Sequence, residues 1–201
     1  MKVALLGYKD AKLIEHFRKC GDEVIWEENK ITPEWISERR IEFIVSFGYR
    51  WILKREVLAL LPDRAINIHI SLLPWNRGAD PNLWSFVEDS PKGVTIHLLD
   101  RGVDTGDIIA QSEIHFKDPS LTLKNTYDTL LETARDLLIR NWDDIRAANF
   151  NRTKQSQNAG SHHLMRDKEK ILHVMPQGYD TPIGIVEKLG REWRENQTDK
   201  K

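Results

Sequence analysis

The feature that most constrains the fold is a regular alternation of short apolar runs and amphipathic segments through the first ninety residues. Each apolar run and the amphipathic segment that follows it cover residues 2–6 and 10–19, 23–26 and 33–39, 43–46 and 54–60, and 65–70 and 82–88. The runs are typical of buried strands, and the segments have helical spacing. Strands that alternate with helices pair in parallel through right-handed crossovers. The pattern therefore predicts half of a doubly wound α/β sheet, a half-Rossmann fold.

The pattern changes after residue 90. Two strand-like runs, residues 93–99 and 108–116, are joined by a turn-rich segment and followed by a long helical pattern from Leu121 to about Ala147. Beyond Asn149 the periodicity weakens until residues 181–193. We expect a mostly parallel sheet in a catalytic domain of residues 1–148. Residues 149–201 are expected to form a small appendage for substrate contacts or dimerisation, with a homodimer left open.

Charge and composition exclude several classes of partner. The 30 basic residues are balanced by 31 acidic ones, so the net charge of -1 offers no electrostatic excess for nucleic acid. Cys20 is the single cysteine, which excludes an internal disulfide and a cysteine metal cluster and is typical of a reducing compartment. Apolar stretches all fall short of the ~20 residues that span a bilayer. We therefore expect a cytoplasmic protein without a nucleic-acid or membrane partner.

Polar side chains gather at the ends of two expected strands. Asn67 and His69 are two residues apart, hence on one strand face, while isoleucines occupy the other. Thr95 and His97 repeat this polar face on the next strand, and the turn that follows contains three aspartates, including Asp104. In open α/β sheets, ligand sites form at the carboxyl ends of strands. The sequence therefore predicts a site that combines two imidazoles, an amide and carboxylates.

Each of these residues also has a simpler interpretation. A histidine on a strand is more often a satisfied core residue than a catalyst, and Asp100 or Asp107 can cap turns. By type, His69, His97 and Asp104 could ligate zinc. Closely spaced ligands such as HExxH are missing from the sequence, so we predict no metal.

Two sequence blocks resemble the paired signature of the folate-dependent formyltransferases. They read N-I-H-I-S-L-L-P-W-N-R-G at residues 67–78 and G-V-T-I-H-L-L-D-R-G-V-D-T-G-D-I-I at residues 93–109. The family includes glycinamide ribonucleotide, methionyl-tRNA and nucleotide-sugar formyltransferases, and the resemblance covers roughly residues 1–140. It implies a half-Rossmann sheet, N10-formyltetrahydrofolate as cosubstrate, and Asn67, His69 and Asp104 as the catalytic trio.

The chemistry of this trio suits attack of an amine on a formyl group. A preorganised donor, either the Asn67 amide or a protonated His69, could stabilise the charge that develops on the formyl oxygen. An imidazole exchanges protons around neutrality, and Asp104 could orient His69 and help to remove a proton from the amine.

The resemblance also implies the residues that contact the two substrates. We expect the folate to be contacted by Trp51, Ile52, Leu53, Leu72, Asp100, Gly102 and Val103. Trp51 could equally belong to the core. The acceptor is expected to contact His97 and the loop that leaves the catalytic strand. The loop residues are Trp75, Asn76, Arg77, Gly78 and Asp80. The guanidinium fork of Arg77 matches a phosphate, although a surface arginine is the alternative.

The acceptor follows from differences between the subfamilies. The first loop, GYKDAKL, lacks the small residues with which glycinamide ribonucleotide transferases bind phosphate. Methionyl-tRNA formyltransferases append a large basic domain, whereas about fifty residues follow the expected catalytic domain here. The chain resembles most the amino-sugar nucleotide N-formyltransferases of surface-polysaccharide synthesis, in which a segment like GSHHLMRD, residues 160–167, contacts the nucleotide.

Three alternatives stay open at this stage. The acceptor could be another small amine such as glycinamide ribonucleotide. The trio could act on water in a folate-dependent hydrolase, or deformylase, which releases formate without any amine. A binding protein without turnover is the third alternative, and the complete trio argues against it.

Overall fold

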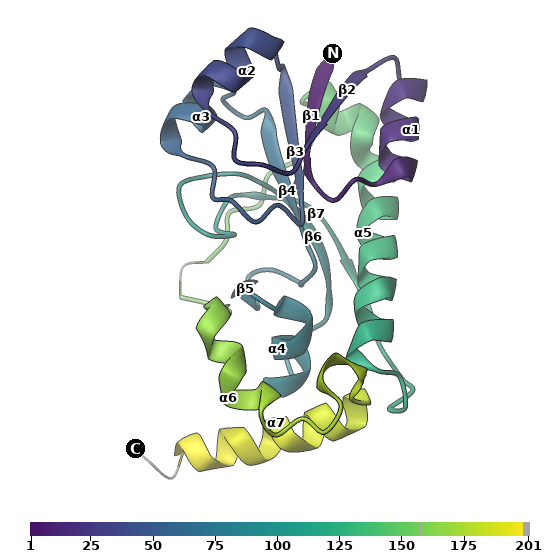
Figure 1. The fold of residues 1–201 in the computed structure, drawn as a ribbon, viewed down its shortest axis with the longest axis vertical. Coiled ribbons are helices and arrows are strands. Elements are labelled where there is room, and N and C mark those ends of the chain that lie inside the picture. Colours follow the sequence, from purple (N-terminus) through teal and green to yellow (C-terminus); the bar gives the residue numbers. More distant parts are fainter. Residues whose placement is uncertain (157, 199–201) are drawn as a thin grey trace. The chain divides into compact units, whose positions relative to one another are not determined.

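The structure, a computed structural model, describes residues 1–156 and 158–198 (Figure 1). The helices and strands before residue 90 are β1 (Lys2–Gly7), α1 (Ala11–Lys19), β2 (Glu23–Glu27), α2 (Pro33–Arg39), β3 (Phe43–Phe47), α3 (Arg55–Leu60), β4 (Ala65–His69), β5 (Arg77–Gly78) and α4 (Pro81–Val87). Those after residue 90 are β6 (Gly93–Leu98), β7 (Ile108–Glu113), α5 (Leu123–Arg146), β8 (His162–His163), α6 (Glu169–Leu172) and α7 (Ile183–Thr198), with short 3-10 turns at Met165–Lys168 and Gly178–Asp180.

The early helices begin where side chains can cap them. The Asp10 carboxylate accepts a hydrogen bond from the backbone N–H of Leu13 at 3.0 Å, and α1 starts one residue after Asp10. The Thr32 hydroxyl accepts from the N–H of Trp35 in the same way, and Pro33 occupies the first position of α2. Such caps satisfy N–H groups that the first helical turn leaves without partners.

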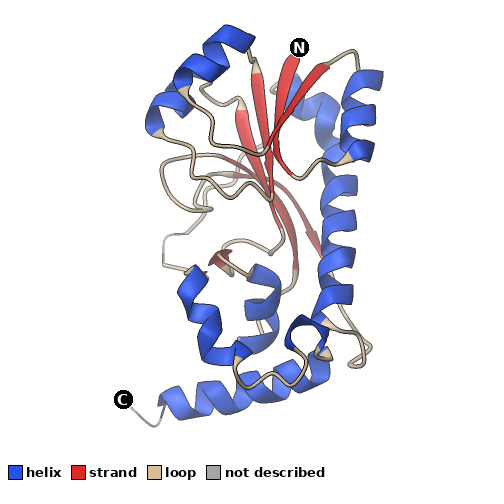
Figure 2. Cartoon of the chain, viewed as in Figure 1, coloured by secondary structure: helices blue, strands red, loops and turns tan. Residues whose placement is uncertain are grey.

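The main sheet has six strands in the order β2-β1-β3-β4-β6-β7. Strands are drawn in red in Figure 2. Strand β1 pairs in parallel with β2 and β3, and β3 pairs in parallel with β4. The predicted, mostly parallel α/β sheet is confirmed. The antiparallel pairing of β6 with β4 was not predicted, because a strand buried on both faces has the same apolar pattern in either direction.

The chain divides into two compact units, and the divisions fall within β6, β7 and α5. Unit 1 comprises residues 1–69, 95–111 and 134–155, and unit 2 comprises residues 70–94, 112–133 and 156–201. The predicted division into a catalytic domain and an appendage after residue 148 concerns function and stays a prediction.

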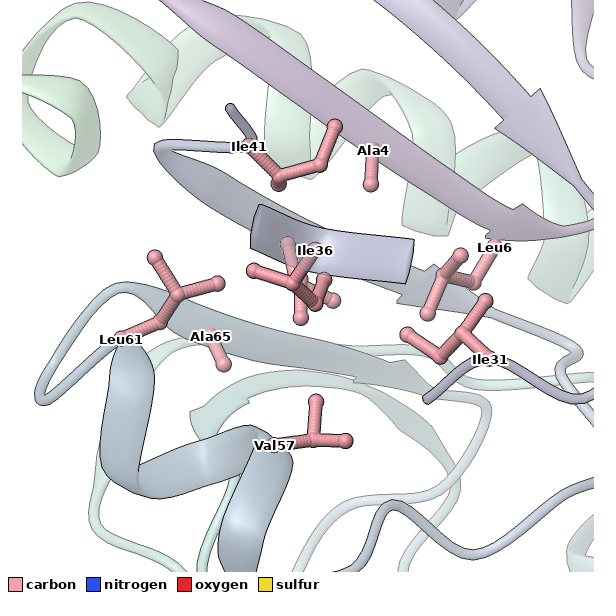
Figure 3. Close-up of a cluster of buried hydrophobic side chains, with 9 residues drawn as sticks. Ala4, Leu6, Ile31, Ile36, Ile41, Val57, Leu61 and Ala65 are labelled. Carbon is pink, nitrogen blue, oxygen red and sulfur yellow. The ribbon is translucent and has the colours of Figure 1, made fainter. Parts of the chain in front are cut away.

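Unit 1 has apolar side chains on both faces of its strands. On one face, α2 and α3 cover a buried cluster that includes Ala4 and Leu6 of β1 and Ala65 of β4 (Figure 3). On the other face, the ring of Trp142 from the last half of α5 packs against the rings of Phe17 and Phe43. Burial of these rings on the strands fixes the sheet on which the candidate site is built.

Unit 2 has a core of its own. Its buried cluster includes Leu83, Trp84 and Phe86 of α4, together with Ile183 and Val186 of α7. Helix α7 extends beyond the predicted end at residue 193, as far as Thr198. Strands β5 and β8 pair in parallel as a second sheet within a region that was expected to be loop. Two-residue strands contain too few positions to show a period, so the sequence did not reveal them.

Candidate active site

Four polar residues share one face of the central strands in unit 1. In the antiparallel pair of β4 and β6, Asn67 lies opposite His97 and His69 lies opposite Thr95. Residues directly opposite each other in such a pair point to the same side of the sheet. The predicted repetition of the polar face is therefore present, at the carboxyl end of β4.

Asp104 joins this face from the turn between β6 and β7. Its Oδ1 accepts a hydrogen bond from Asn67 Nδ2 at 3.2 Å, and the same oxygen lies 3.4 Å from His97 Nε2. Its Oδ2 lies 3.6 Å from His69 Nδ1, a distance for an ion pair rather than for a hydrogen bond. The His69, His97 and Asp104 side chains are only 8%, 1% and 12% exposed. The structure thus brings the predicted trio together and adds His97 to it.

The hydrogen bonds of His97 determine how the Asn67 amide is oriented. His97 Nδ1 lies 2.8 Å from the carbonyl oxygen of Leu98, which can only accept, so Nδ1 carries a hydrogen. In neutral His97 the other nitrogen, Nε2, is then an acceptor, and Asn67 Nδ2 donates to it at 3.2 Å. Since Asn67 Nδ2 also donates to Asp104, the amide nitrogen faces both partners. The amide oxygen Oδ1 therefore points away from them.

The turn that contains Asp104 is held by contacts that require specific residues. The Asp100 carboxylate accepts hydrogen bonds from the Gly102 N–H at 3.0 Å and from the Thr105 hydroxyl at 2.7 Å. A Cβ atom on Gly106 would lie 1.7 Å from the carbonyl oxygen of Leu98, so this position requires glycine. The Asp100 carboxylate therefore caps the turn, which was the simpler interpretation of this residue. Contacts of Asp100 and Gly102 with a folate stay a prediction.

Three large apolar side chains near this edge of unit 1 are exposed. Trp51, Ile52 and Val103 are 43%, 73% and 40% exposed, so the alternative that Trp51 belongs to the core does not hold. Trp51 and Ile52 follow β3, whose carboxyl end lies beside β4, and Val103 precedes Asp104. Covering exposed apolar side chains with a bound ligand removes them from water and is favourable, so these three residues are candidates for a ligand contact. Leu53 instead packs against the α2 and α3 cluster.

The remaining predicted contacts belong to unit 2. Leu72 is half-buried and Trp75 is 38% exposed. Arg77 is only 9% exposed and is therefore not a surface arginine. Its guanidinium donates to the backbone carbonyl oxygens of Ser156 at 3.1 Å and Ala159 at 3.5 Å. These bonds favour a structural role, and the use of Arg77 as a phosphate clamp stays a prediction.

Asp80 is also engaged within unit 2. Its Oδ1 accepts a hydrogen bond from the Tyr179 hydroxyl at 2.8 Å, and its Oδ2 lies 3.6 Å from Lys168 Nζ. Burial and the adjacent Asp80 carboxylate raise the pKa of Tyr179. These partners lie about ninety to one hundred residues further along the chain, so local patterns did not predict these contacts.

The sequence also did not predict a buried polar network in unit 2. Ser90 donates to Asn76 Oδ1 at 2.7 Å, and the Asn76 N–H donates to Ser161 Oγ at 3.0 Å. Ser161 in turn donates to one oxygen of Glu88 at 2.6 Å, and His163 Nε2 lies 3.0 Å from the other. The network ties Asn76 and Gly78, whose strand pairs with β8, to the segment around residue 162.

Within the part of the chain that the structure describes, no three His, Cys, Asp or Glu side chains are grouped as a metal site. In the same part, no helix has the length and apolar character needed to cross a bilayer.

Comparison with known proteins gives consistent matches. The family model for formyl transferases matches residues 26–141. The methionyl-tRNA formyltransferase of Clostridium perfringens (strain SM101 / Type A) is 34% identical over 144 residues, which is 70% of this chain and 46% of that protein. The corresponding enzyme of Finegoldia magna is 31% identical over 141 residues, 65% of this chain and 45% of that protein. The chain thus spans about half the length of the curated relatives it matches.

Two solved structures extend the comparison. PseJ from Anoxybacillus kamchatkensis, a formyltransferase in complex with UDP-4,6-dideoxy-4-formamido-L-AltNAc and tetrahydrofolate, superposes with a TM-score of 0.88 at 42% identity, over 94% of this chain and 100% of that one. An N-formyltransferase from Helicobacter canadensis, in complex with folinic acid and dTDP-3-aminofucose, shares the fold with a TM-score of 0.71 at 19% identity, over 96% of this chain and 82% of that one. The family match covers more than half of the chain and shows that this chain belongs to the formyl transferase family.

Proposed function

We propose that the protein transfers a formyl group from N10-formyltetrahydrofolate to the amine of a nucleotide-linked amino sugar. The observation that supports the acceptor most directly is the likeness to PseJ, because it extends over nearly all of this chain and all of that one. The methionyl-tRNA formyltransferases match less than half of their own length. Net charge also favours a small acceptor, since -1 gives no attraction for a tRNA.

The contacts within the cluster support a proposed role for each residue. Because the Asn67 amide nitrogen faces His97 and Asp104, its Oδ1 is proposed to accept a hydrogen bond from the acceptor amine. His69 Nδ1 faces Asp104, so Nε2 on the far side of the ring is proposed to donate to the formyl oxygen. Of the two donors to the formyl oxygen that the sequence left open, Asn67 and His69, this geometry favours His69.

Asp104 is proposed to accept the proton that the attacking amine loses. The folate supplies a one-carbon group at the formyl oxidation level. When the amine nitrogen bonds to the formyl carbon, it must lose a proton, and the departing folate nitrogen must gain one. The Asp104 carboxylate, whose Oδ2 lies 3.6 Å from His69 Nδ1, can orient His69 and can accept the proton of the amine directly or through water.

The donor site is proposed at the exposed apolar side chains of unit 1. Trp51, Ile52 and Val103 would cover the folate ring system, and backbone groups of the turn at residues 100–104 would bind its polar edge. The loop at residues 71–80 leaves β4 directly after His69, so contacts with the acceptor are proposed there. Surface-polysaccharide synthesis, a cytoplasmic location, a homodimer and independence of metals stay predictions.

The test is a reaction of the purified protein with N10-formyltetrahydrofolate and a panel of UDP- and dTDP-linked amino sugars. Mass spectrometry should detect one added formyl group on a sugar nucleotide, with release of one tetrahydrofolate per product. Equal release of formate with and without an amine would instead identify a hydrolase. Folate binding without either product would identify a binding protein.

A further inference from the structure

Gln155 contacts the turn that contains Asp104 although it lies about fifty residues further along the chain. Its amide nitrogen Nε2 donates to the backbone carbonyl oxygen of Asp104 at 2.9 Å and to that of Gly106 at 2.7 Å. Both acceptors are carbonyls, so the amide nitrogen must face them, and both of its hydrogens are used. Gln155 thus bridges the two ends of the short segment 104–106.

The segment before Gln155 is fixed at the edge of unit 1. Thr153 and Ile108, the first residue of β7, exchange two backbone hydrogen bonds of 2.8 and 2.9 Å. The Arg152 guanidinium also lies 2.8 Å from the Asp63 carboxylate. Because the bridge to β7 holds the backbone next to the turn, the Gln155 side chain reaches the carbonyls of residues 104 and 106 from an anchored position.

Asp104 needs such support because its backbone is in an unfavourable conformation. Its φ is 54°, in the left-handed region that favours glycine and that other residues keep only when their surroundings hold them there. Asp100 holds the first part of the turn through Gly102 and Thr105, as described above. Gln155 holds the part that follows, and it contacts the carbonyl group of Asp104 itself.

We propose that Gln155 is a positioning residue for formyl transfer. By binding the carbonyls of residues 104 and 106, it fixes the direction in which the Asp104 carboxylate leaves the backbone. The distances of 3.2 Å to Asn67 Nδ2 and 3.6 Å to His69 Nδ1 depend on that direction. Displacement of a reacting group by about 1 Å can cost on the order of 100-fold in rate. The kinetic part of this proposal rests on the proposed function, whereas its structural part does not.

The kinetic test compares four proteins that differ at Gln155 and Asp104. Gln155→Leu keeps the approximate size of the side chain and removes both donors, and we expect it to lower kcat by about 10- to 100-fold while the acceptor KM stays within about 2-fold. In an Asp104→Asn enzyme, the same change should lower kcat by less than about 3-fold, because Gln155 acts through Asp104. Equal losses in both backgrounds would overturn the proposal.

A matched control separates positioning from anchoring of the segment. Arg152→Leu removes the ion pair to Asp63 from the same segment and leaves the two Gln155 bonds in place. It should keep kcat within about 2-fold of the wild type. Gln155→Glu, which places a carboxylate against two carbonyl oxygens, should be at least as impaired as Gln155→Leu. Full activity of Gln155→Glu would contradict the proposal.

A second readout does not require a known acceptor. Amide hydrogen exchange of the peptide that covers residues 100–108 should be faster in Gln155→Leu than in the wild type and unchanged in Arg152→Leu. If the wild type formylates none of the amino sugars, the proposed acceptor fails while this measurement still tests the role of Gln155. Identical exchange in the wild type and Gln155→Leu would show that the bridge does not hold the turn.

Discussion

At the scale of single residues, the Asn67 amide has a defined orientation in the candidate site. The Asn67 amide nitrogen lies 3.2 Å from both His97 Nε2 and Asp104 Oδ1, and these two atoms lie 3.4 Å apart. An amide held from two sides cannot turn without losing both hydrogen bonds, and loss of paired buried groups is costly. The site is therefore preorganised before a substrate binds.

The first prediction concerns the trio. Asn67→Ala, His69→Ala and Asp104→Ala should each lower kcat by at least about 100-fold, because each removes a group that acts on the reacting atoms. Circular dichroism and thermal unfolding of each variant should verify that the fold is kept. The losses should not add in double variants, since the three residues act on one transition state. Substantial turnover by a folded His69→Ala protein would refute the mechanism.

The second prediction tests whether Arg77 has a structural role or binds the diphosphate of the acceptor. Its guanidinium donates to two backbone carbonyls in unit 2, so Arg77→Lys should lower stability by about 1–3 kcal/mol through the loss of one or both bonds. Urea unfolding measures this change. An unchanged unfolding midpoint together with a raised acceptor KM would instead support Arg77 as the clamp for the diphosphate.

The sequence was informative about some of these residues and not about others. Asn67, His69 and Asp104 lie in two short blocks that resemble the formyltransferase signature, so the sequence predicted that they lie together, as they do in the structure. The pairing of His97 with Asn67 depends on the antiparallel register of β6, which is a tertiary property. Gln155 is an ordinary polar residue after a helix, and nothing in its neighbourhood along the chain marks its contact with Asp104.

At the scale of elements, the long ones were predictable and the shortest ones were not. The predicted helix at residues 33–39 has the same bounds as α2. Its start was predictable because Pro33 is favoured at the first helical position after a capping residue such as Thr32. Strands β1 to β4 are apolar runs bounded by turns and were placed within about one residue. By contrast, β5 and β8 exist only because two distant dipeptides pair, so their position depends on the folded chain.

The third prediction tests this small sheet. Gly78 has a φ of +87°, and a Cβ atom on it would lie 2.3 Å from the carbonyl oxygen of His163 in β8. Gly78→Ala should therefore destabilise the protein by about 2–4 kcal/mol through backbone strain and overlap together. Gly21→Ala is the matched control, since φ is +79° there but no atom lies within 4 Å, and only about 1 kcal/mol is expected. Equal unfolding midpoints of the two variants in urea would contradict the contact.

The fourth prediction concerns acid stability at the end of α4. Burial raises the pKa of Glu88, but His163 at 3.0 Å, the Ser161 hydrogen bond and the charge of Arg194 together outweigh it and hold the pKa below its usual value of 4.5. A carboxylate whose pKa is depressed by folding stabilises the folded state above the unfolded pKa, and this contribution is lost as the pH falls through the folded pKa. Thermal unfolding of the wild type should therefore shift downward below about pH 4.5, and Glu88→Gln should shift less over the same range. Parallel curves for the two proteins would contradict this role of Glu88.

At the scale of the whole molecule, identity with two kinds of relatives points to different acceptors. The curated methionyl-tRNA formyltransferases share 31–34% identity with this chain, but only over 45–46% of their own length. PseJ shares 42% identity, and this chain matches all of it. Identity to both kinds of formyltransferase shows the family and does not by itself distinguish acceptors. The regions of the chain that do not contain the candidate catalytic residues are more informative about the acceptor.

The last prediction concerns that acceptor. A sugar nucleotide is small and has a diphosphate, so specific hydrogen bonds can bind it although the overall charge is -1. A tRNA, by contrast, is bound largely through phosphate contacts that need many cations and weaken steeply with salt. We expect kcat/KM to be highest for a nucleotide-linked 4-amino or 3-amino sugar and to vary little between about 50 and 200 mM salt. Glycinamide ribonucleotide and charged initiator tRNA should be inert in the same assay, and efficient, salt-sensitive formylation of the tRNA would refute the sugar assignment.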